Sequence, residues 1–367
     1  MITRLYADNF RCLSNFELKL GSMALLVGDN GTGKSSVLAV MERLCRIASD
    51  PTADLGELMP WSTLTRWDRR TEQHFELDIV VAERAYRYTL RLAHDTSDAS
   101  ARILAESIQA GERTIYSCTD GSAVWYREDG NIFELPLRAA AQRSLLALFD
   151  FSTAEHEILR VRDALSRCAT LRLDPTRIAA DAPREVDRIA ADGHDFARWY
   201  LHFVTSAPSA QGPLFTTLAA VLPGFQALRF DGRGANRTLY ADFAAGSTRY
   251  ALRFDELSEG QRALIVLYAL LAGLGADGTL WIDEPVNHIA LGEIQPWLFE
   301  ALERLDTGGQ IVLVSHHPDL IDFMAAREAI VFHRPHGGPT RVMPLTVDRD
   351  EALRASDVIR KRLIADD

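Results

Sequence analysis

The chain of 367 residues has few cysteines and no long apolar run. Its four cysteines form no CxxC pair and have no histidine at metal-ligand spacing, which argues against a disulfide framework and a zinc site. No window reaches the ~18 consecutive apolar residues that a membrane-spanning helix needs. Residues 1–13 lack the apolar core of a signal peptide. We therefore expect a cytoplasmic protein without a membrane segment.

Positive charge is also scarce, with 40 Lys and Arg against 51 Asp and Glu, for a net charge of −11. This balance argues against a protein that coats nucleic acid, although a local basic groove is compatible with it. Apolar residues make up 47% of the chain and charged residues 25%, which predicts a folded protein of one large domain or two. No internal repeat and no heptad run of coiled-coil length is present.

The hydrophobic pattern divides the chain into three segments. Residues 1–135 hold an alternating start, a short apolar run ("SMALLVG"), a helical pattern and then strand-like runs that predict an antiparallel meander. Residues 136–225 are mostly helical in pattern. Residues 226–367 begin with strand-like runs and then alternate helix and strand, which is typical of a parallel sheet with helices on its faces. We therefore expect an α/β fold with a mixed sheet, a β meander and a helical insert.

Residues 28–35, "GDNGTGKS", fit the spacing G-x-x-x-x-G-K-[ST] between an apolar strand and a helix. Glycines let such a loop wrap closely, so that its N–H groups point at phosphates, and the helix start adds positive potential. Lys34 would supply a positive charge and Ser35 a hydroxyl ligand for Mg²⁺. A chance glycine-rich turn is the alternative, and the strand–loop–helix context favours the phosphate loop.

Two later strands end in polar residues. "TLWIDEP" ends in Asp283, which would reach Mg²⁺ through water, and Glu284, which could orient an attacking water. "QIVLVSHHP" ends in His316, which could sense the terminal phosphate. Taken alone, these residues are also compatible with an acidic turn and with a helix start before Pro318.

Residues 255–262, "DELSEGQR", precede an apolar helical run. Ser258 and the N–H groups after it would form an exposed helix N-terminus, which binds anions. We expect Ser258 and Gly260 of one subunit to cap the phosphate that Lys34 of another subunit holds. An ordinary Ser N-cap describes the local geometry equally well.

Together these motifs resemble the ABC-type ATPases of the SMC, RecF and OLD group, which have the P-loop NTPase fold. "LLVGDNGTGKSSVL" looks like their Walker A, "FDELSEGQRALIVLYALL" their signature helix, "TLWIDEP" their Walker B and "QIVLVSHHPDLID" their switch-histidine strand. "ADGHDFARWYLHF" is similar to a motif in the helical insert of OLD-like members. The segments 1–135 and 226–367 would then be the two ATPase lobes, and 136–225 the insert.

The resemblance implies a slow ATPase that works as an ATP-sandwich dimer with ATP and Mg²⁺. The implied catalytic residues are Glu284 and His316. The implied nucleotide contacts are Asn30, Gly31, Thr32, Gly33, Lys34, Ser35, Ser36 and Arg11, with Ser258 and Gly260 acting across the dimer. The metal ligands would be Ser35, Asp283 and, as the best match to the Q-loop glutamine, Gln73.

The sequence also departs from the family. After the Walker B strand relatives usually read Glu-Asn-Gly-Leu-His-Pro, where this chain has Val286-Asn287-His288-Ile289-Ala290-Leu291, so its D-loop diverges. About 220 residues separate the phosphate loop from the signature helix without a coiled-coil pattern, which excludes SMC-style arms. About 50 residues follow His316, so we do not expect the Toprim nuclease domain that OLD proteins carry, and we expect any nuclease or toxin to be a separate chain.

Three functions remain open at this point. The first is a nucleotide-switched sensor or scaffold that controls a separate effector protein in bacterial antiphage defence. The second is a RecF-like DNA-repair ATPase that clamps DNA, with a basic face drawn from Arg66, Arg69, Arg70, Arg84 and Arg87 or from "RKR" at 360–362. The third, a transporter ATPase subunit, fits the large insert poorly.

Overall fold

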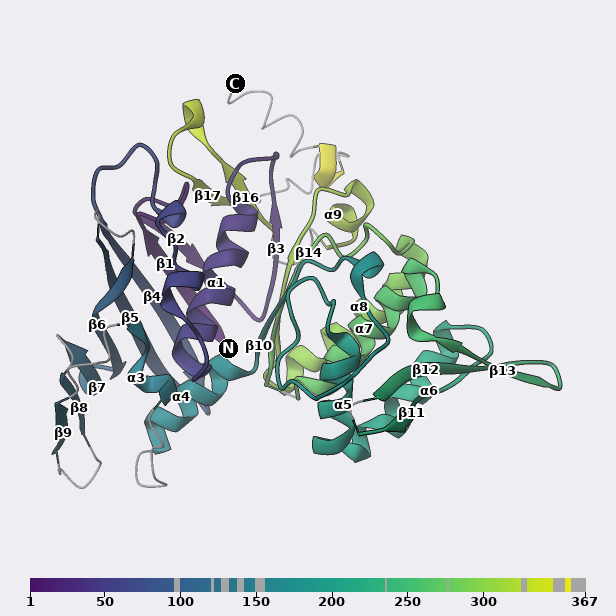
Figure 1. Ribbon diagram of the computed structural model, residues 1–367. Helices are drawn as coiled ribbons and strands as arrows, with labels where there is room; N and C mark the ends of the chain where they lie inside the picture. Colours follow the sequence, from purple (N-terminus) through teal and green to yellow (C-terminus); the bar gives the residue numbers. More distant parts are fainter. Residues whose placement is uncertain are drawn as a thin grey trace. The chain divides into compact units, whose positions relative to one another are not determined.

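The computed structural model has two compact units (Figure 1). The first comprises residues 1–168 and 321–367, and the second comprises residues 169–320. These boundaries differ from the segments 1–135, 136–225 and 226–367 that the sequence suggested. The structure describes residues 1–95, 100–119, 122–126, 132–136, 142–148, 156–234, 236–275, 277–324, 329–345 and 354–357.

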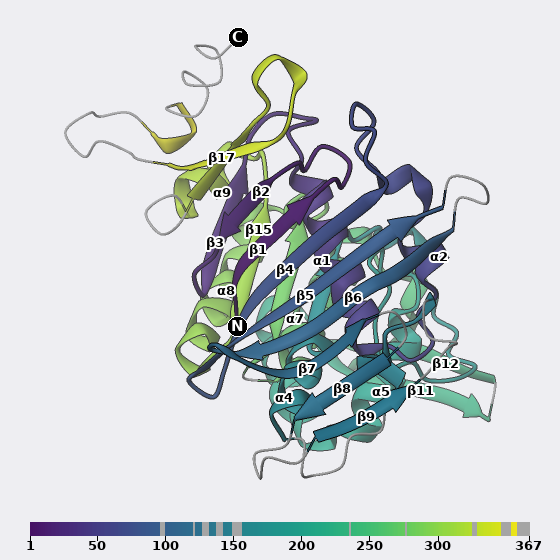
Figure 2. The same ribbon diagram turned by 90° about the vertical axis from the view of Figure 1, so that its left-hand side faces the viewer.

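The first unit contains a sheet of eight strands (Figure 2). Its order is β2-β1-β4-β5-β6-β7-β8-β9, and the pairs are antiparallel. Alternate residues of β4 are buried, as in a strand with one face on a core. The predicted meander is therefore confirmed. The strands are β1 (Ile2–Asp8), β2 (Phe16–Lys19), β4 (Glu72–Val81), β5 (Arg84–His94), β6 (Ala101–Ala110), β7 (Arg113–Thr119), β8 (Ser122–Tyr126) and β9 (Ile132–Pro136).

A second strand group in this unit supports the phosphate loop. All five residues of β3 (Met23–Val27) are buried, and β3 pairs in parallel with β16 (Ala329–His333). Strand β17 (Arg341–Pro344) then pairs antiparallel with β16. A strand buried on both faces accounts for the continuous apolar run "MALLV".

The helices of the first unit are α1 (Lys34–Ser49), α2 (Leu55–Leu58), α3 (Leu145–Leu148) and α4 (His156–Ser166). Helix α1 packs against α3 and α4, and α4 also contacts β4 and β7. The apolar residues of α1 recur at helical spacing and are buried, among them Val37, Met41 and Leu44. This packing fixes the helix whose first turn completes the phosphate loop.

The second unit pairs β10 (Cys168–Leu171), β14 (Thr279–Asp283) and β15 (Gln310–Val314) in that order. A separate antiparallel sheet consists of β11 (Phe225–Arg233), β12 (Asn236–Ala245) and β13 (Thr248–Arg253). The helices are α5 (Phe196–Ser206), α6 (Gln211–Val221), α7 (Glu259–Gly273) and α8 (Leu291–Glu303). Helix α9 (Pro318–Met324) crosses the boundary between the units.

Short 3₁₀ turns complete the described chain at Trp61–Thr63, Pro175–Arg177, Pro208–Ala210, Phe254–Glu256, Arg304–Thr307 and Pro335–Gly337. The α/β class with a mixed sheet is confirmed. The segment 136–225 is less helical than its pattern suggested, because it includes β10 and a stretch of irregular backbone before α5. The sequence also has turn signals for the meander at Asp120-Gly121 and Asp129-Gly130, and these positions lie outside the described residues. In the described part of the chain, no helix is both long and apolar enough to span a membrane.

One carboxyl group is buried against the sheet of the first unit. Glu106 on β6 is 1% exposed, and it accepts hydrogen bonds from the hydroxyl groups of Tyr88 (2.8 Å), Tyr116 (2.9 Å) and Ser144 (2.6 Å). Burial raises the pKa of Glu106 above its usual value, although these hydrogen bonds oppose the rise. Glu106 thereby ties the segment before α3 to the strands.

We predict that Glu106→Ala lowers the free energy of unfolding by roughly 3 kcal/mol, because three buried hydroxyl groups lose their acceptor. Glu106→Gln keeps an acceptor and carries no charge. Because the pKa of Glu106 is higher in the folded than in the unfolded protein, its contribution to stability is fully present below the unfolded-state pKa. That contribution is lost as the pH rises through the folded-state pKa. Denaturant unfolding should therefore show Glu106→Gln gaining stability relative to the native protein as the pH rises above the usual pKa of a glutamate side chain. A pH-independent difference would contradict this assignment.

Candidate functional site

The phosphate loop has a backbone that only glycine can adopt at two positions. Gly28 has φ +142°, and a Cβ there would lie 2.3 Å from the carbonyl oxygen of Phe332. Gly33 has φ +106°, and a Cβ there would lie 2.4 Å from Oγ1 of Thr340. Contacts below 3.0 Å leave no room for a side chain. The glycines of the motif are therefore required both by conformation and by close packing.

The start of α1 is open to an anion. Gly33 is the N-cap residue and no side chain caps the helix, so the first turn keeps its positive end for a ligand. Lys34 is 8% exposed, and its Nζ donates to the carbonyl oxygens of Gly28 (2.5 Å) and Asp29 (2.9 Å). Ser35 is exposed, as are the loop-tip residues 29–31. A charge and a hydroxyl thus lie at the mouth of the loop.

The C-terminal part of the first unit holds this loop in place. Thr340 is fully buried; its Oγ1 donates to the carbonyl oxygen of Thr32 (2.8 Å) and its N–H to that of Cys12 (2.9 Å). Arg334 donates to the carbonyl oxygen of Gly31 (3.1 Å). Sequence reasoning missed both residues, because more than 300 positions separate them from the loop and no spacing pattern links them.

The predicted contact Arg11 lies on a second loop beside the phosphate loop. Arg11 is exposed and has φ +52°, a left-handed backbone that is uncommon outside glycine. The thiol of the adjacent Cys12 donates to Oγ of Ser36 on α1 (3.5 Å). Buried Asn9 holds the same loop through its amide, which donates to the carbonyl oxygens of Arg70 and Glu72. Arg11 is thus close in the fold to the start of α1.

Gln73 does not have the environment of a metal ligand. It is 1% exposed; its Nε2 donates to the carbonyl oxygen of Asn9 (2.9 Å), and its Oε1 pairs with Nε2 of His94 (2.9 Å). Both ends of the amide are therefore used inside the protein, where they hold the loop that carries Arg11. The structure corrects the expectation for Gln73, whereas Ser35 and Asp283 stay predictions as metal ligands.

In the second unit, Asp283 and Glu284 follow directly from the buried strand β14. Asp283 is 8% exposed, and Nε of Arg172 lies 3.7 Å from its Oδ2. Glu284 has φ +52°, and its N–H donates to the carbonyl oxygen of Val314 (2.8 Å). A non-glycine residue held in the left-handed region stores strain, which is often found at functional sites.

The structure brings Glu284 and His316 together. Nδ1 of His316 lies 2.6 Å from Oε1 of Glu284, and buried Ser315 donates from its hydroxyl to Oε2 (3.1 Å). The parallel pairing of β14 with β15 accounts for this contact, because Asp283 is the register partner of Val314 and both strands end at the same edge. Ser315, to which the sequence motifs gave no role, fixes the carboxylate orientation.

The signature helix α7 begins with the expected cap. Oγ of exposed Ser258 accepts from the N–H of Gln261 (3.3 Å), and Oε1 of Gln261 accepts from the N–H of Ser258 (3.1 Å). The diverged D-loop packs on this cap: Nδ1 of His288 lies 3.3 Å from Glu259 Oε2, and a Cβ on Gly260 would lie 3.1 Å from the carbonyl oxygen of His288. The divergence at His288 therefore creates a link to the signature motif.

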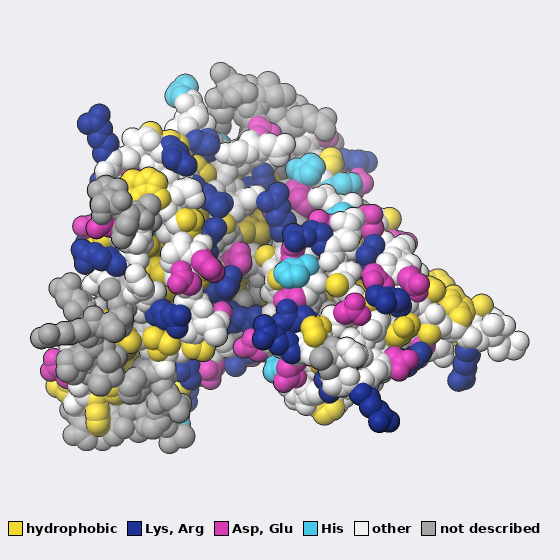
Figure 3. Space-filling model, in the orientation of Figure 1, with side chains coloured by type: hydrophobic (Ala, Val, Ile, Leu, Met, Phe, Trp, Pro, Cys, Tyr) yellow, Lys and Arg dark blue, Asp and Glu magenta, His cyan; other side chains and the backbone are white. Residues whose placement is uncertain are grey.

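The arginines considered for DNA binding are mostly neutralised. Arg70 pairs with Asp8 and Asp68 (both 2.6 Å); Arg84 pairs with Glu157 (3.1 Å) and Arg87 with Asp78 (2.6 Å). On the face that Figure 3 shows, basic and acidic side chains are interspersed. Residues 360–362 lie outside the described residues. Three of the five candidate arginines are thus paired with carboxylates among the described residues.

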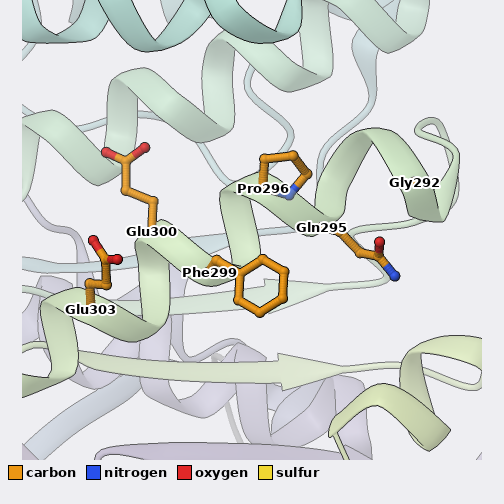
Figure 4. A pocket seen from close by; sticks show the side chains of 6 residues that line it. All are labelled: Gly292, Gln295, Pro296, Phe299, Glu300 and Glu303. Atoms are coloured by element: carbon orange, nitrogen blue, oxygen red, sulfur yellow. The ribbon is translucent and has the colours of Figure 1, made fainter.

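A groove of about 630 Å³ runs along α8 (Figure 4). Its lining residues are Gly292, Gln295, Pro296, Phe299, Glu300 and Glu303. Two carboxylates and no basic side chain line it, so it does not suit a triphosphate. The described residues also contain no group of three His, Cys, Asp or Glu side chains that could hold a metal ion. Hydroxyl and carboxylate oxygens such as those of Ser35 and Asp283 do fit Mg²⁺.

Comparison with known proteins agrees with this geometry. Residues 23–322 match a family described as "AAA domain, putative AbiEii toxin, Type IV TA system". The chain belongs to this family. Its resemblance to ATPases of the SMC and OLD type is thereby confirmed, and ATP and a divalent metal are the ligands that such a family binds in general.

One curated relative is an OLD nuclease from Thermus scotoductus, 43% identical over 42 residues, which are 11% of this chain and 8% of that protein. The Smc head domain of Pyrococcus furiosus, in a structure with the C-terminal domain of ScpA, has a TM-score of 0.54 at 11% identity, covering 100% of this chain and 99% of that one. The SMC head domain of Thermotoga maritima has a TM-score of 0.44 at 12% identity, with coverage of 94% and 99%. The Pyrococcus likeness shows the fold.

We predict that Gly33→Ala lowers the free energy of unfolding of the nucleotide-free protein by roughly 2–4 kcal/mol, because it adds left-handed strain and a clash with Thr340. Gly31→Ala is the matched control: Gly31 has φ +80°, but nothing lies within 4 Å of the position that its Cβ would occupy, so about 1 kcal/mol is expected. Denaturant unfolding measures both. Equal losses of unfolding free energy in the two variants would show that the contact with Thr340 does not contribute to stability.

Proposed function

We propose that this protein binds ATP with Mg²⁺, hydrolyses it slowly, and works as a nucleotide-switched dimer that controls a separate effector protein. The observation that carries this proposal is the Glu284–His316 pair at the end of β14 and β15, with Nδ1 and Oε1 at 2.6 Å. The sequence predicts these two residues as the water-orienting base and the phosphate sensor, and they share one hydrogen-bond network.

Phosphate binding is supported by the first unit. The uncapped start of α1 offers N–H groups, and Lys34, now bonded to the loop carbonyls of Gly28 and Asp29, supplies a charge that can turn to phosphate oxygens. Ser35 on the loop and Asp283 at the end of β14 would hold the metal. When bound, the metal neutralises charge on the phosphates.

Hydrolysis is supported by the second unit. The side chain of Glu284 is 17% exposed, so it can reach a water while Ser315 and His316 restrain its orientation. Restraint of this kind favours one attacking geometry for the water. Arg172, 3.7 Å from Asp283, places a further cation at the same strand end. The exposed imidazole of His316 can change partner when a phosphate arrives.

The exposed start of α7 supports the proposed dimer, because it offers a second anion site. Ser258 is exposed at the start of α7 and its hydroxyl already caps the helix. A phosphate held by Lys34 of a second copy would be recognised by this helix start and by the N–H of Gly260. Such a head-to-tail, two-fold arrangement gives two equivalent composite sites.

The partner is proposed from the family. Its description names a toxin–antitoxin system, and a short part of the chain matches an OLD nuclease. We infer an ATP-dependent sensor or scaffold that holds or releases an effector during antiphage defence. Its nucleotide state would control exposure of the effector-binding surface.

Mixing two inactive variants tests the shared site. Lys34→Ala and Ser258→Arg should each reduce ATP hydrolysis at least about 100-fold. In the mixture, half of the dimers are mixed and each has one intact site, so activity should return to about a quarter of the native value. Phosphate release is the measurement. No recovery, with both variants folded and able to exchange subunits, would contradict the composite site.

A second mixture is the matched control. Lys34 and Glu284 are proposed to serve the same ATP from one chain, so Lys34→Ala mixed with Glu284→Gln leaves no complete site. We expect no recovery of phosphate release in that mixture. Recovery there would mean that Lys34 and Glu284 act on one ATP from different chains.

A further inference from the structure

One exposed aromatic residue lies at the phosphate loop without a role so far. Trp67 is 51% exposed, the most exposed of the six tryptophans. It lies in the loop between the 3₁₀ turn Trp61–Thr63 and β4. Leaving so large an apolar surface in water is unfavourable, so an exposed indole beside a ligand site suggests a binding role.

Arg334 links this indole to the phosphate loop. Its Cζ lies 5.4 Å from the centre of the Trp67 ring, and Nη1 donates to the carbonyl oxygen of Gly31 at the loop tip (3.1 Å). Its other donors reach the carbonyl oxygens of Gly338 (2.8 Å) and Gly337 (2.5 Å). One guanidinium group therefore separates the indole from the loop and fixes the ring in place.

The charge of Arg334 is not neutralised by a carboxylate among the described residues, since its partners are backbone carbonyl groups and the indole. The neighbouring Arg66 and Arg69 are exposed as well. The surface beside the loop tip thus combines an aromatic ring with positive charge. These are the two features by which proteins bind a base attached to phosphates.

We propose that Trp67 is the surface on which the base of the bound nucleotide stacks, with Arg334 as the residue that positions the ring. This proposal rests on the proposed nucleotide function, because the phosphates must occupy the loop at Lys34. Stacking uses the π face that every base has. The site therefore favours the larger purines over pyrimidines and separates ATP from GTP only weakly.

Affinities for ATP and for inorganic tripolyphosphate separate the base contact from the phosphate contact. Trp67→Ala should weaken ATP binding about tenfold, the size typical of losing one base–aromatic stack, and leave tripolyphosphate binding unchanged. Trp67→Phe keeps a ring and should stay close to the native affinity for ATP. Titration calorimetry of the full chain with each ligand gives the values.

Two controls complete the experiment. Phe299→Ala removes another exposed aromatic side chain, 55% exposed on α8, and should change neither affinity. Thermal unfolding of each variant confirms that it is folded.

The outcomes separate the two proposals. If native protein binds neither ATP nor tripolyphosphate, the nucleotide function itself fails. If native protein binds both and Trp67→Ala keeps its ATP affinity, the stacking proposal is overturned. If Trp67→Ala loses affinity for both ligands equally, Trp67 shapes the phosphate loop and the stacking proposal is overturned as well.

Discussion

The close contact between Gly33 and Thr340 is the constraint on which the phosphate site depends. Thr340 packs directly against Gly33, and its hydroxyl donates a hydrogen bond to the carbonyl oxygen of Thr32 in the same turn. The loop has no regular structure of its own, so its shape must come from neighbours. Because Cys12 and Arg334 close it on other sides, the backbone is set before a ligand arrives, which lowers the ordering cost of binding.

In the second unit, neighbouring residues fix the position of one side chain, as they fix the loop backbone in the first unit. Glu284 is held in a strained backbone conformation at the end of a buried strand, and Ser315 and His316 from the next strand restrain its carboxylate. A parallel pair of strands places both ends at one edge, so two residues distant in sequence meet without a long loop. The diverged D-loop follows directly, and His288 ties it to the signature helix. Hydrogen bonds and chain continuity thus connect the strand end at Glu284, the D-loop and the signature helix.

Local patterns allowed much of this to be predicted. The strand–glycine loop–helix at 28–35, the Ser258 cap and the strand ends at Glu284 and His316 each lie within a few consecutive residues, where spacing dictates geometry. The prediction for Gln73 was wrong because the role of this residue depends on which face of the strand is buried. Its side chain lies inside the protein, where it hydrogen-bonds to His94 and Asn9. Thr340 and Arg334 could not be found, since nothing in a single sequence encodes which distant segment packs behind a loop. Strand β10 is four residues long, too short for a periodic signal.

The solution mass of Glu284→Gln, measured by light scattering with and without Mg-ATP, tests the central claim most directly. The substitution keeps the size of the side chain and its contacts with Ser315 while removing the base, so ATP should bind and persist. The account predicts that the mass doubles only when Mg-ATP is present, and that adding Lys34→Ala to the same chain abolishes the change. A mass that does not respond to bound ATP would contradict the nucleotide-switched dimer.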